Sequence, residues 1–264
     1  MASELNGKVA LVTGASRGIG RSIACALAVC GAWVALVARD AGRLRAVETD
    51  IRLAGGTARA FPADVQRIEA VDLLKAEVNA VLGQPAILVN AAGVFGPIQL
   101  VKDGDPALWI ETISVNLIGP YLTCRAFVGD MIAGGWGRVV NVSSAASLTP
   151  PGPLISAYST SKAALNHLTR ALAAETLGTG VTVNVIHPGE VKTEMWAHIR
   201  DESAKLGPLG ESGRMWAKWV EDTGGDLPEK AAELVLRLMS DEAAAVTGRF
   251  LWIEDGLQGP IPSW

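Results

Sequence analysis

Short runs of apolar residues recur along the chain and alternate with longer segments of helical composition. The runs predict strands, because they are about four to eight residues long and rich in β-branched residues. They occupy residues 8–13, 33–37, 57–62, 85–89, 138–144, 181–186 and 246–253. The predicted helices occupy residues 21–30, 42–54, 67–82, 108–132, 158–177 and 228–239. This alternation predicts an α/β fold with a parallel sheet and helices on both faces.

Polar residues and small residues stand where the predicted strands end. The carboxyl ends of parallel strands meet at one edge of a sheet, and ligands bind such sheets at that edge. We therefore expect one ligand site there, formed by residues from six strand ends. In chain order these residues are Gly14, Arg39, Asp64, Asn90, Ser144 and Pro188.

A glycine-rich turn separates the first predicted strand from the first predicted helix. Its spacing is Gly-x-x-x-Gly-x-Gly, over Gly14, Gly18 and Gly20. Glycines let the backbone approach an anion closely, and the N-terminus of the helix favours negative charge. The turn predicts a nucleotide phosphate site, and an ordinary strand–helix turn is the alternative.

The end of the second predicted strand bears on the choice of nucleotide. An acid here would bind a ribose 2′-hydroxyl, whereas an arginine would hold a 2′-phosphate. Ala38 followed by Arg39, with Arg17 in the glycine turn, favours the phosphate, and Asp40 argues against it. Further on, we expect Asp64 to cap the helix that follows it, with contact to an adenine amino group as the alternative.

A tyrosine and a lysine four residues apart, Tyr158 and Lys162, lie on one face of a predicted helix. Ser144 ends an apolar run, which brings its hydroxyl to the same edge of the sheet. The unperturbed pKa of a phenol is about 10, and we expect Lys162 to lower the pKa of Tyr158 by favouring the phenolate. The three groups predict a proton-transfer site in which Ser144 holds the substrate oxygen. The alternative is a buried tyrosine at the start of a core helix beside a solvated lysine.

Residues 190–226 break the alternation of strands and helices. Their large apolar side chains include Met195, Trp196 and Trp216. These side chains either pack a small subdomain or form a lid over an apolar substrate pocket. We treat residues 1–264 as one domain, with residues 190–226 as a substrate-binding lid inserted in it.

Composition narrows the classes of function. The chain has 264 residues, of which 49% are hydrophobic and 19% charged, as in a globular domain with a large core. A net charge of −4 without a basic block argues against nucleic acid as a partner. The three cysteines lack metal-ligand spacing and are typical of reduced core thiols, which predicts a cytoplasmic protein without a metal site. No apolar run is long enough for a membrane span.

Taken together, the motifs resemble those of the short-chain dehydrogenase/reductase family, at family spacing from about Lys8 to Gly256. The resemblance implies a three-layer, doubly wound Rossmann-type fold with about seven parallel strands. The matching motifs are Thr13-Gly14-x-x-x-Gly18-Ile19-Gly20, Asn90-Ala91-Ala92-Gly93, Asn116, Ser144, Tyr158-x-x-x-Lys162 and Pro188-Gly189.

The resemblance also implies a catalytic tetrad of Asn116, Ser144, Tyr158 and Lys162. Tyr158 would be the general acid in carbonyl reduction and the base in alcohol oxidation. Ser144 would orient the substrate oxygen, and Asn116 would anchor a water of a proton relay. Lys162 would lower the pKa of the tyrosine and bind the nicotinamide ribose.

By the same resemblance the cofactor is NADP(H), because the acid that selects NAD in the family falls at Ala38. The residues implied in cofactor binding, besides Tyr158 and Lys162, are Gly14, Ser16, Arg17, Gly18, Ile19, Gly20, Arg39, Asp64, Val65, Asn90, Ala91, Gly93, Pro188, Gly189, Val191 and Thr193. The resemblance further implies a homotetramer, with a homodimer as the alternative.

We therefore predict an NADP(H)-dependent carbonyl reductase that acts on a fairly apolar ketone, or on the alcohol in reverse. One alternative is a 3-oxoacyl-acyl-carrier-protein reductase, and another is a non-catalytic NADP(H)-binding sensor. Family members that reduce carrier-bound substrates tend to have arginines at two places that here hold 134–136 and 177–179. Neither place contains an arginine in this chain, which disfavours the first alternative.

Overall fold

Seven parallel strands form a single sheet in the computed structural model, which describes residues 5–148 and 152–261. The strand order is β3-β2-β1-β4-β5-β6-β7. The chain adds β2 and β3 on one side of β1, and then crosses over to add β4 to β7 on the other side. This order and the parallel pairing confirm the predicted doubly wound sheet. The strands are β1 (Val9–Thr13), β2 (Trp33–Ala38), β3 (Thr57–Pro62), β4 (Pro85–Asn90), β5 (Gly137–Val142), β6 (Val181–His187) and β7 (Phe250–Trp252).

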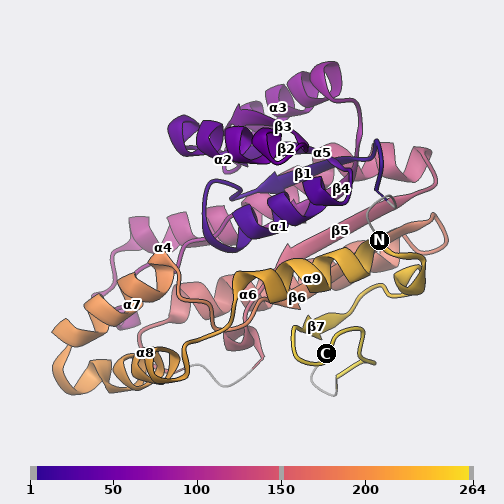
Figure 1. Cartoon of the computed structure of the whole chain (residues 1–264). Coiled ribbons are helices and arrows are strands. Elements are labelled where there is room, and N and C mark those ends of the chain that lie inside the picture. The colour runs from indigo at the N-terminus through magenta and orange to yellow at the C-terminus, as the bar shows by residue number, and fades with distance from the viewer. Residues whose placement is uncertain (1–4, 149–151, 262–264) are drawn as a thin grey trace.

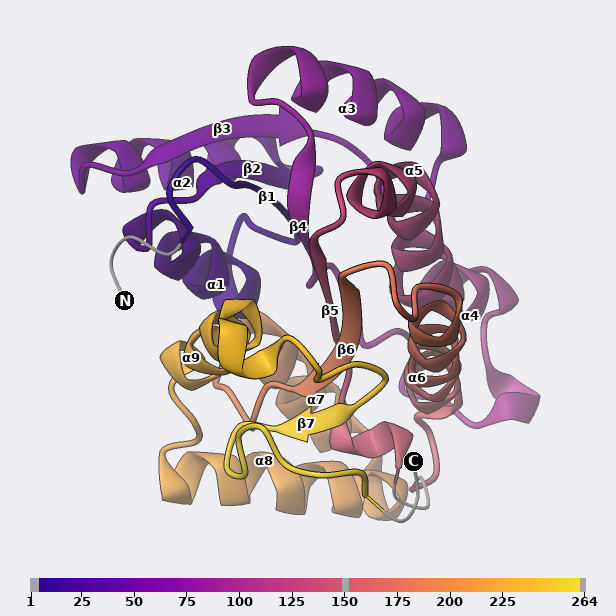
Figure 2. The same cartoon turned by 90° about the vertical axis from the view of Figure 1, so that its right-hand side faces the viewer.

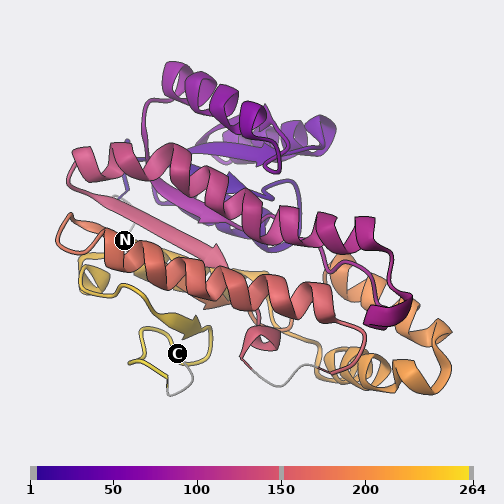
Figure 3. The same ribbon diagram turned by 180° about the vertical axis from the view of Figure 1, so that it is seen from behind.

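Helices cover both faces of the sheet and complete three layers (Figures 1, 2 and 3). Ala10 and Val12 of β1 pack in one apolar cluster, and Val9 and Leu11 pack in the other, because alternate side chains of a strand point to opposite faces. The helices α1 (Gly18–Val29), α2 (Ala41–Leu53) and α9 (Pro228–Met239) cover the first face. The other face is covered by α3 (Ile68–Val81), α5 (Gly119–Ala133) and α6 (Ser156–Glu175).

Two predicted strands are longer than the strands that form. The strand predicted to reach Ser144 ends at Val142, and the last one is confined to Phe250–Trp252. Gly248 has a φ of +67°, which lies outside the extended region, so regular strand geometry begins only after it. The residues before β7 still bond to β6, because Thr247 accepts a hydrogen bond from the backbone N–H of Val183.

The helix predicted over residues 108–132 is interrupted by a wider turn. It forms as α4 (Pro106–Ile113), a π-helical turn over Ser114–Ile118, and α5. Pro120, in the first turn of α5, has no N–H to donate to the oxygen of Asn116 four positions before it, so one α-helical hydrogen bond is missing there. The N–H of Gly119 bonds instead to the oxygen of Ser114, five residues back. The wider turn contains Asn116, which is fully buried.

Residues 190–226 contain two helices that lie beyond the carboxyl ends of the strands (Figure 1). They are α7 (Glu194–Lys205) and α8 (Glu211–Thr223). Gly224, with a φ of +88°, ends α8. A β-bridge between Val191 and Asp226 joins the two ends of this segment, which is called the α7–α8 segment below.

Within the described residues, no helix combines the length and the apolar character that a bilayer span requires. At the C-terminus the structure describes the chain as far as Ile261.

The core predicts a large stability difference between two single substitutions. Phe127 of α5 is fully buried, so Phe127→Ala leaves a cavity and should lower the free energy of unfolding by about 3–5 kcal/mol. Leu53, at the end of α2, is 83% exposed, so Leu53→Ala should change it by about 0.5 kcal/mol or less. Urea unfolding followed by circular dichroism measures both. Equal losses would contradict the packing described here.

Candidate active site

A buried tyrosine stands at the carboxyl edge of the sheet, in the first turn of α6. The side chain of Tyr158 is 8% exposed, and its ring stacks on that of Phe95 with 4.6 Å between centroids. Its hydroxyl forms a hydrogen bond with the side chain of Ser144, two residues after the end of β5. The Ser144 hydroxyl oxygen also accepts a bond from the N–H of Ala146 at 3.2 Å. Packing and hydrogen bonding therefore fix both oxygens at this edge.

Lys162 lies one helical turn further along α6, on the same face as the tyrosine. It is 5% exposed, and its Nζ donates to the backbone oxygen of Val142 at 2.7 Å. The Nζ atom lies 5.8 Å from the centroid of the Tyr158 ring. The predicted convergence of phenol, ammonium and serine hydroxyl is therefore present at the end of β5.

The predicted direction of the tyrosine pKa shift is wrong. Burial raises the pKa of Tyr158 to about 12, the hydrogen bond from Ser144 opposes this rise, and the charge of Glu190 adds to it. Burial lowers the pKa of Lys162 to about 8. Removal from water disfavours the charged form of each group, and Lys162 is not among the groups that shift the pKa of Tyr158. At neutral pH the phenol keeps its proton, as a proton donor must.

Asn116 fixes the loop that follows β4. Its Oδ1 accepts from the N–H of Val94 at 2.9 Å, and its Nδ2 donates to the oxygen of Val94 at 2.9 Å and to Ser161 at 3.0 Å. A side chain on Gly93 would begin 3.4 Å from Asn116 and 3.6 Å from the Nζ of Lys162. Asn116 and Lys162 are thus neighbours across Gly93, while the water relay implied for Asn116 stays a prediction.

The glycine-rich turn forms a tight cradle at the start of α1. A Cβ on Gly14 would lie 2.7 Å from the nitrogen of Ala92, and one on Gly20 would lie 2.4 Å from the oxygen of Gly14. The N-cap residue Arg17 makes no side-chain cap, so its side chain satisfies none of the first-turn N–H groups of α1. A dinucleotide pyrophosphate fits such a cradle. Ser16 lies within this turn, and Ile19 faces the cavity described below.

The segment after β4 can contact a cofactor through its backbone rather than through its polar side chains. The amide of Asn90 donates to Asn141 at 2.9 Å and accepts from Thr123 at 2.7 Å, both in the interior. The hydroxyl of Thr13 accepts from the N–H groups of Ala91 and Ala92 at 3.1 Å each. Because its side chain is already bonded within the interior, Asn90 can contact a cofactor only through its backbone.

The predicted helix cap at Asp64 is wrong. The N-cap of α3 is Arg67, and Oδ1 of Asp64 accepts instead from the backbone and side chain of Gln66 at 3.1 and 3.2 Å. The carboxylate closes a local turn, because a helix that begins at residue 68 is out of its reach. Val65, beside it, is 7% exposed and packs against Gly119.

Three arginines gather beside the glycine-rich turn. Burial lowers the pKa of Arg17, and the charges of Arg43 and Arg39 lower it further, so the three guanidinium groups lie within range of one another. Glu194, the first residue of α7, pairs with both Arg17 and Arg43. Asp40 caps α2 by accepting from the N–H of Arg43 at 3.0 Å.

A cavity of about 370 Å³ opens beside Tyr158 and Ser144, between the sheet edge and the α7–α8 segment. Met195, Trp196 and Trp216, which the sequence proposed as substrate contacts, all line it. Met195 and Trp216 pack on a small apolar cluster centred on Ile98, Leu154 and Ile199. Pro188, Gly189, Val191 and Thr193 also line the cavity.

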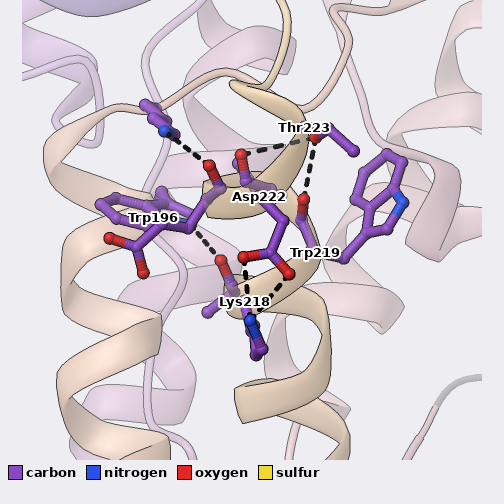
Figure 4. A network of polar contacts seen from close by, with 9 residues as sticks. Trp196, Lys218, Trp219, Asp222 and Thr223 are labelled. Atoms are coloured by element: carbon purple, nitrogen blue, oxygen red, sulfur yellow. Dashed lines mark hydrogen bonds and ion pairs between the residues drawn. The ribbon is translucent and has the colours of Figure 1, made fainter.

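Polar contacts join the two helices above this cavity (Figure 4). The indole N–H of Trp196 donates to the oxygen of Ala217 in α8 at 3.3 Å, and Lys192 donates to the oxygen of Glu221 at 3.2 Å. Lys218 pairs with Asp222 on the outer surface of α8. These contacts make α7 and α8 one unit. Among the described residues, no three His, Cys, Asp or Glu side chains gather as metal ligands.

Sequence reasoning missed three residues of this region: Phe95, Arg43 and Glu190. Phe95 follows the motif after β4, and Glu190 follows Pro188-Gly189 as an acid among cavity-lining residues. Arg43 stands in the first turn of α2, shortly after Arg39. Their directions depend on contacts with distant elements, and no local pattern gives those.

Comparison with known proteins places the chain in a family. The family model described as short chain dehydrogenase matches residues 8–204. Galactitol 2-dehydrogenase (L-tagatose-forming) of Cereibacter sphaeroides is 36% identical over 260 residues, covering 96% of this chain and 95% of that protein. The 3-oxoacyl-acyl-carrier-protein reductase FabG of Pseudomonas aeruginosa is 34% identical, covering 96% and 98%. The chain spans only 63% of a longer relative, a short chain dehydrogenase of Pseudocercospora fijiensis, which is 39% identical over 196 residues.

A solved structure agrees with the sequence matches. A variant of actinorhodin polyketide ketoreductase, solved with NADPH, has a TM-score of 0.86 and 32% identity, covering 97% of this chain and 98% of that one. The match to the family model covers well over half of the chain, and it coincides with the seven-stranded fold and the grouping of Ser144, Tyr158 and Lys162. The chain therefore belongs to the short-chain dehydrogenase family of oxidoreductases.

Proposed function

We propose that the chain transfers a hydride between NADP(H) and a ketone or secondary alcohol. The observation that carries this proposal is the buried phenol of Tyr158, which keeps its proton at neutral pH and bonds to Ser144 beside a largely apolar cavity. A neutral acid in a dry site can protonate a carbonyl oxygen as it accepts a hydride. This is an NADP(H)-dependent reaction at a CH–OH group.

Tyr158, Ser144 and Lys162 have different roles in this reaction. NADPH, when bound, supplies the hydride. Tyr158 donates its proton to the carbonyl oxygen in reduction and takes a proton from the alcohol in oxidation. Ser144 bonds to the same oxygen and orients it. The ammonium of Lys162, held by the oxygen of Val142, binds the nicotinamide ribose and stabilises the phenolate that remains after proton transfer.

The charges around the glycine-rich turn support NADP(H) rather than NAD(H). Arg17, Arg39 and Arg43 provide three guanidinium groups, the usual partners of a phosphate. Asp40, the residue that argued for NAD, has its carboxylate occupied as the cap of α2 and in an ion pair with Arg43. The solved relative with NADPH is consistent with this choice.

A reductase of carrier-bound 3-oxoacyl groups remains the alternative function, supported by the similarity to FabG. It is disfavoured by Trp136 and Leu177, which lie in the two stretches where carrier-dependent members tend to have arginines. A non-catalytic sensor is disfavoured by the burial and hydrogen bonding of Tyr158 and Lys162, which such a role does not require. Comparing NADPH-dependent turnover of a free β-keto ester with that of a carrier-bound one separates the two enzymes, and a sensor would turn over neither.

We further propose that the α7–α8 segment is a lid over the substrate, and that the protein is a cytoplasmic homotetramer or homodimer. Leu108 and Ile110 of α4 and Tyr121 of α5 are large side chains that are 45%, 60% and 48% exposed. They make these helices a suitable surface for pairing two copies.

Removal of the phenolic hydroxyl should abolish turnover without loss of the fold. Tyr158→Phe should lower kcat for ketone-dependent NADPH oxidation by about 100- to 10,000-fold, the usual contribution of a general acid. Tyr121→Phe, which changes the other tyrosine, is the matched control and should leave kcat unchanged. Full activity of the Tyr158 variant would exclude the phenol as the acid.

The pH profile of ketone reduction should report Lys162. Because burial lowers its pKa to about 8, the ammonium is present below that pH and lost above it. Tyr158 keeps its proton throughout this range, since its pKa is about 12. The value of kcat/KM should therefore be flat from about pH 6 to 7.5 and fall above about pH 8. Lys162→Arg keeps a cation at every pH in this range. Whatever kcat/KM this variant retains should therefore not fall above pH 8. A rate that rises through pH 8 would contradict the assignment.

Cofactor choice should depend on Arg43 and, in the opposite sense, on Glu194. Arg43→Ala should lower the preference for NADPH over NADH by about 10- to 100-fold, because a charged partner of the phosphate is lost. Glu194→Gln should lower the KM for NADPH, because the carboxylate that occupies Arg17 and Arg43 is gone. Arg52→Ala, at the other end of α2, is the control. Equal use of NADH and NADPH by the unaltered protein would overturn the proposal.

A further inference from the structure

One acidic side chain lies in the wall of the otherwise largely apolar cavity. Among the described lining residues, Glu190 is the only Asp, Glu, Lys or Arg. Its neighbours in the wall include Phe95, Leu154, Met195 and Ile199. An acid in such a wall costs free energy unless a partner compensates for the water it loses. Its presence at the proposed substrate site therefore calls for a partner.

The backbone of Glu190 is held firmly. Its N–H donates to Oδ2 of Asp226 at 2.9 Å, and its oxygen accepts from the N–H of Asp226 at 3.0 Å. Gly189 before it has a φ of +81°, and a Cβ there would lie 2.4 Å from a side-chain carbon of Ile253. The chain therefore delivers the carboxylate to one place in the cavity wall.

The two carboxylate oxygens are in different situations. Oε2 accepts from the indole N–H of Trp216, in α8, at 3.0 Å. Oε1 lies 3.8 Å from Nε2 of His187, which is too long for a hydrogen bond. Nδ1 of His187 accepts from the N–H of Ala145, so the neutral ring carries its hydrogen on Nε2. Burial lowers the pKa of His187 to about 4, so this ring is not a cation at neutral pH. Oε1 thus has the capacity for a further donor.

The carboxylate shares one cavity with the reacting groups, because Glu190, Tyr158 and Ser144 all line it. The charge of Glu190 also raises the pKa of Tyr158. Trp216 already partly satisfies the carboxylate, which suits a neutral donor better than a second buried charge. A hydroxyl is the neutral donor that a carbonyl compound commonly carries.

We propose that Glu190 binds a hydroxyl group that the substrate carries beside its carbonyl carbon. The chain then selects hydroxyketones over simple ketones, and diols over simple alcohols in the reverse direction. This inference rests on the proposed function, names its substrate class and involves no covalent step.

Matched ketones test the selection. The ratio of kcat/KM for 2-hydroxycyclohexanone to that for cyclohexanone, with NADPH, should be about 10 to 100 in the unaltered protein. Glu190→Leu should bring the ratio to about one, and Glu190→Gln, which keeps an acceptor for Trp216, should give an intermediate value. Glu254→Gln removes a nearby charge that does not line the cavity and should leave the ratio unchanged.

Two outcomes would overturn the proposal. If Glu190→Leu lowers kcat/KM equally for both ketones, the role of Glu190 is only structural. The other outcome is a stronger preference for 2-aminocyclohexanone that Glu190→Gln abolishes, since the partner would then be a cation.

Binding without turnover separates this inference from the proposed function. Calorimetric titration of the protein with NADPH present should show tighter binding of cyclohexane-1,2-diol than of cyclohexanol, with the difference lost in Glu190→Leu. If this difference is found but neither ketone is reduced, the inference stands and the proposed function fails. If both ketones are reduced with a ratio that ignores Glu190→Leu, the proposed function stands and the inference fails.

Discussion

The removal of a phenol and an ammonium group from water, on one face of one helix, is the constraint on which the site depends. Tyr158 and Lys162 are 8% and 5% exposed, and burial pushes each toward its neutral form. The phenol consequently holds its proton strongly at neutral pH, while the amine stays charged only below about pH 8. A charge that develops in this dry setting interacts strongly with its neighbours. Proton transfer from Tyr158 would therefore depend on Lys162, whose positive charge would stabilise the phenolate.

The fold supplies this burial from several directions. The ring of Phe95 covers Tyr158, and the end of β5 provides the oxygen of Val142 that holds Lys162. The wide turn before Pro120 contains Asn116, which ties the loop after β4 to Ser161 in α6. The site is thus a product of the sheet edge, one irregular helix and one loop.

The sequence predicts the parts of this structure that depend on local pattern. The apolar runs predicted the parallel strands. The glycine-rich turn was also predicted, and glycines are needed there because Gly14 and Gly20 approach neighbouring backbone closely. Tyr158 and Lys162 share a helix face because their spacing requires it. The same spacing misled the pKa argument, since it reveals the attraction between two groups but not the loss of water around them.

Other features depend on contacts between distant segments and were beyond the sequence pattern. The pairing of Glu194 with Arg17 and Arg43 joins residues more than 150 positions apart in the chain. The bond between Trp216 and Glu190 depends on how α8 lies over the sheet edge. Asp64 looked like a helix cap because an acid shortly before a predicted helix is typical of one, but α3 begins only at Ile68 and the carboxylate closes a short turn instead.

The ionisation of Tyr158 itself tests the central claim most directly. In a Tyr121→Phe background Tyr158 is the only tyrosine, so the near-ultraviolet absorbance of phenolate during a pH titration reports this group alone. The account predicts no phenolate up to about pH 10 and a pKa of about 12 in the folded protein. A folded protein whose Tyr158 ionises below the ordinary phenol value of about 10 would contradict it.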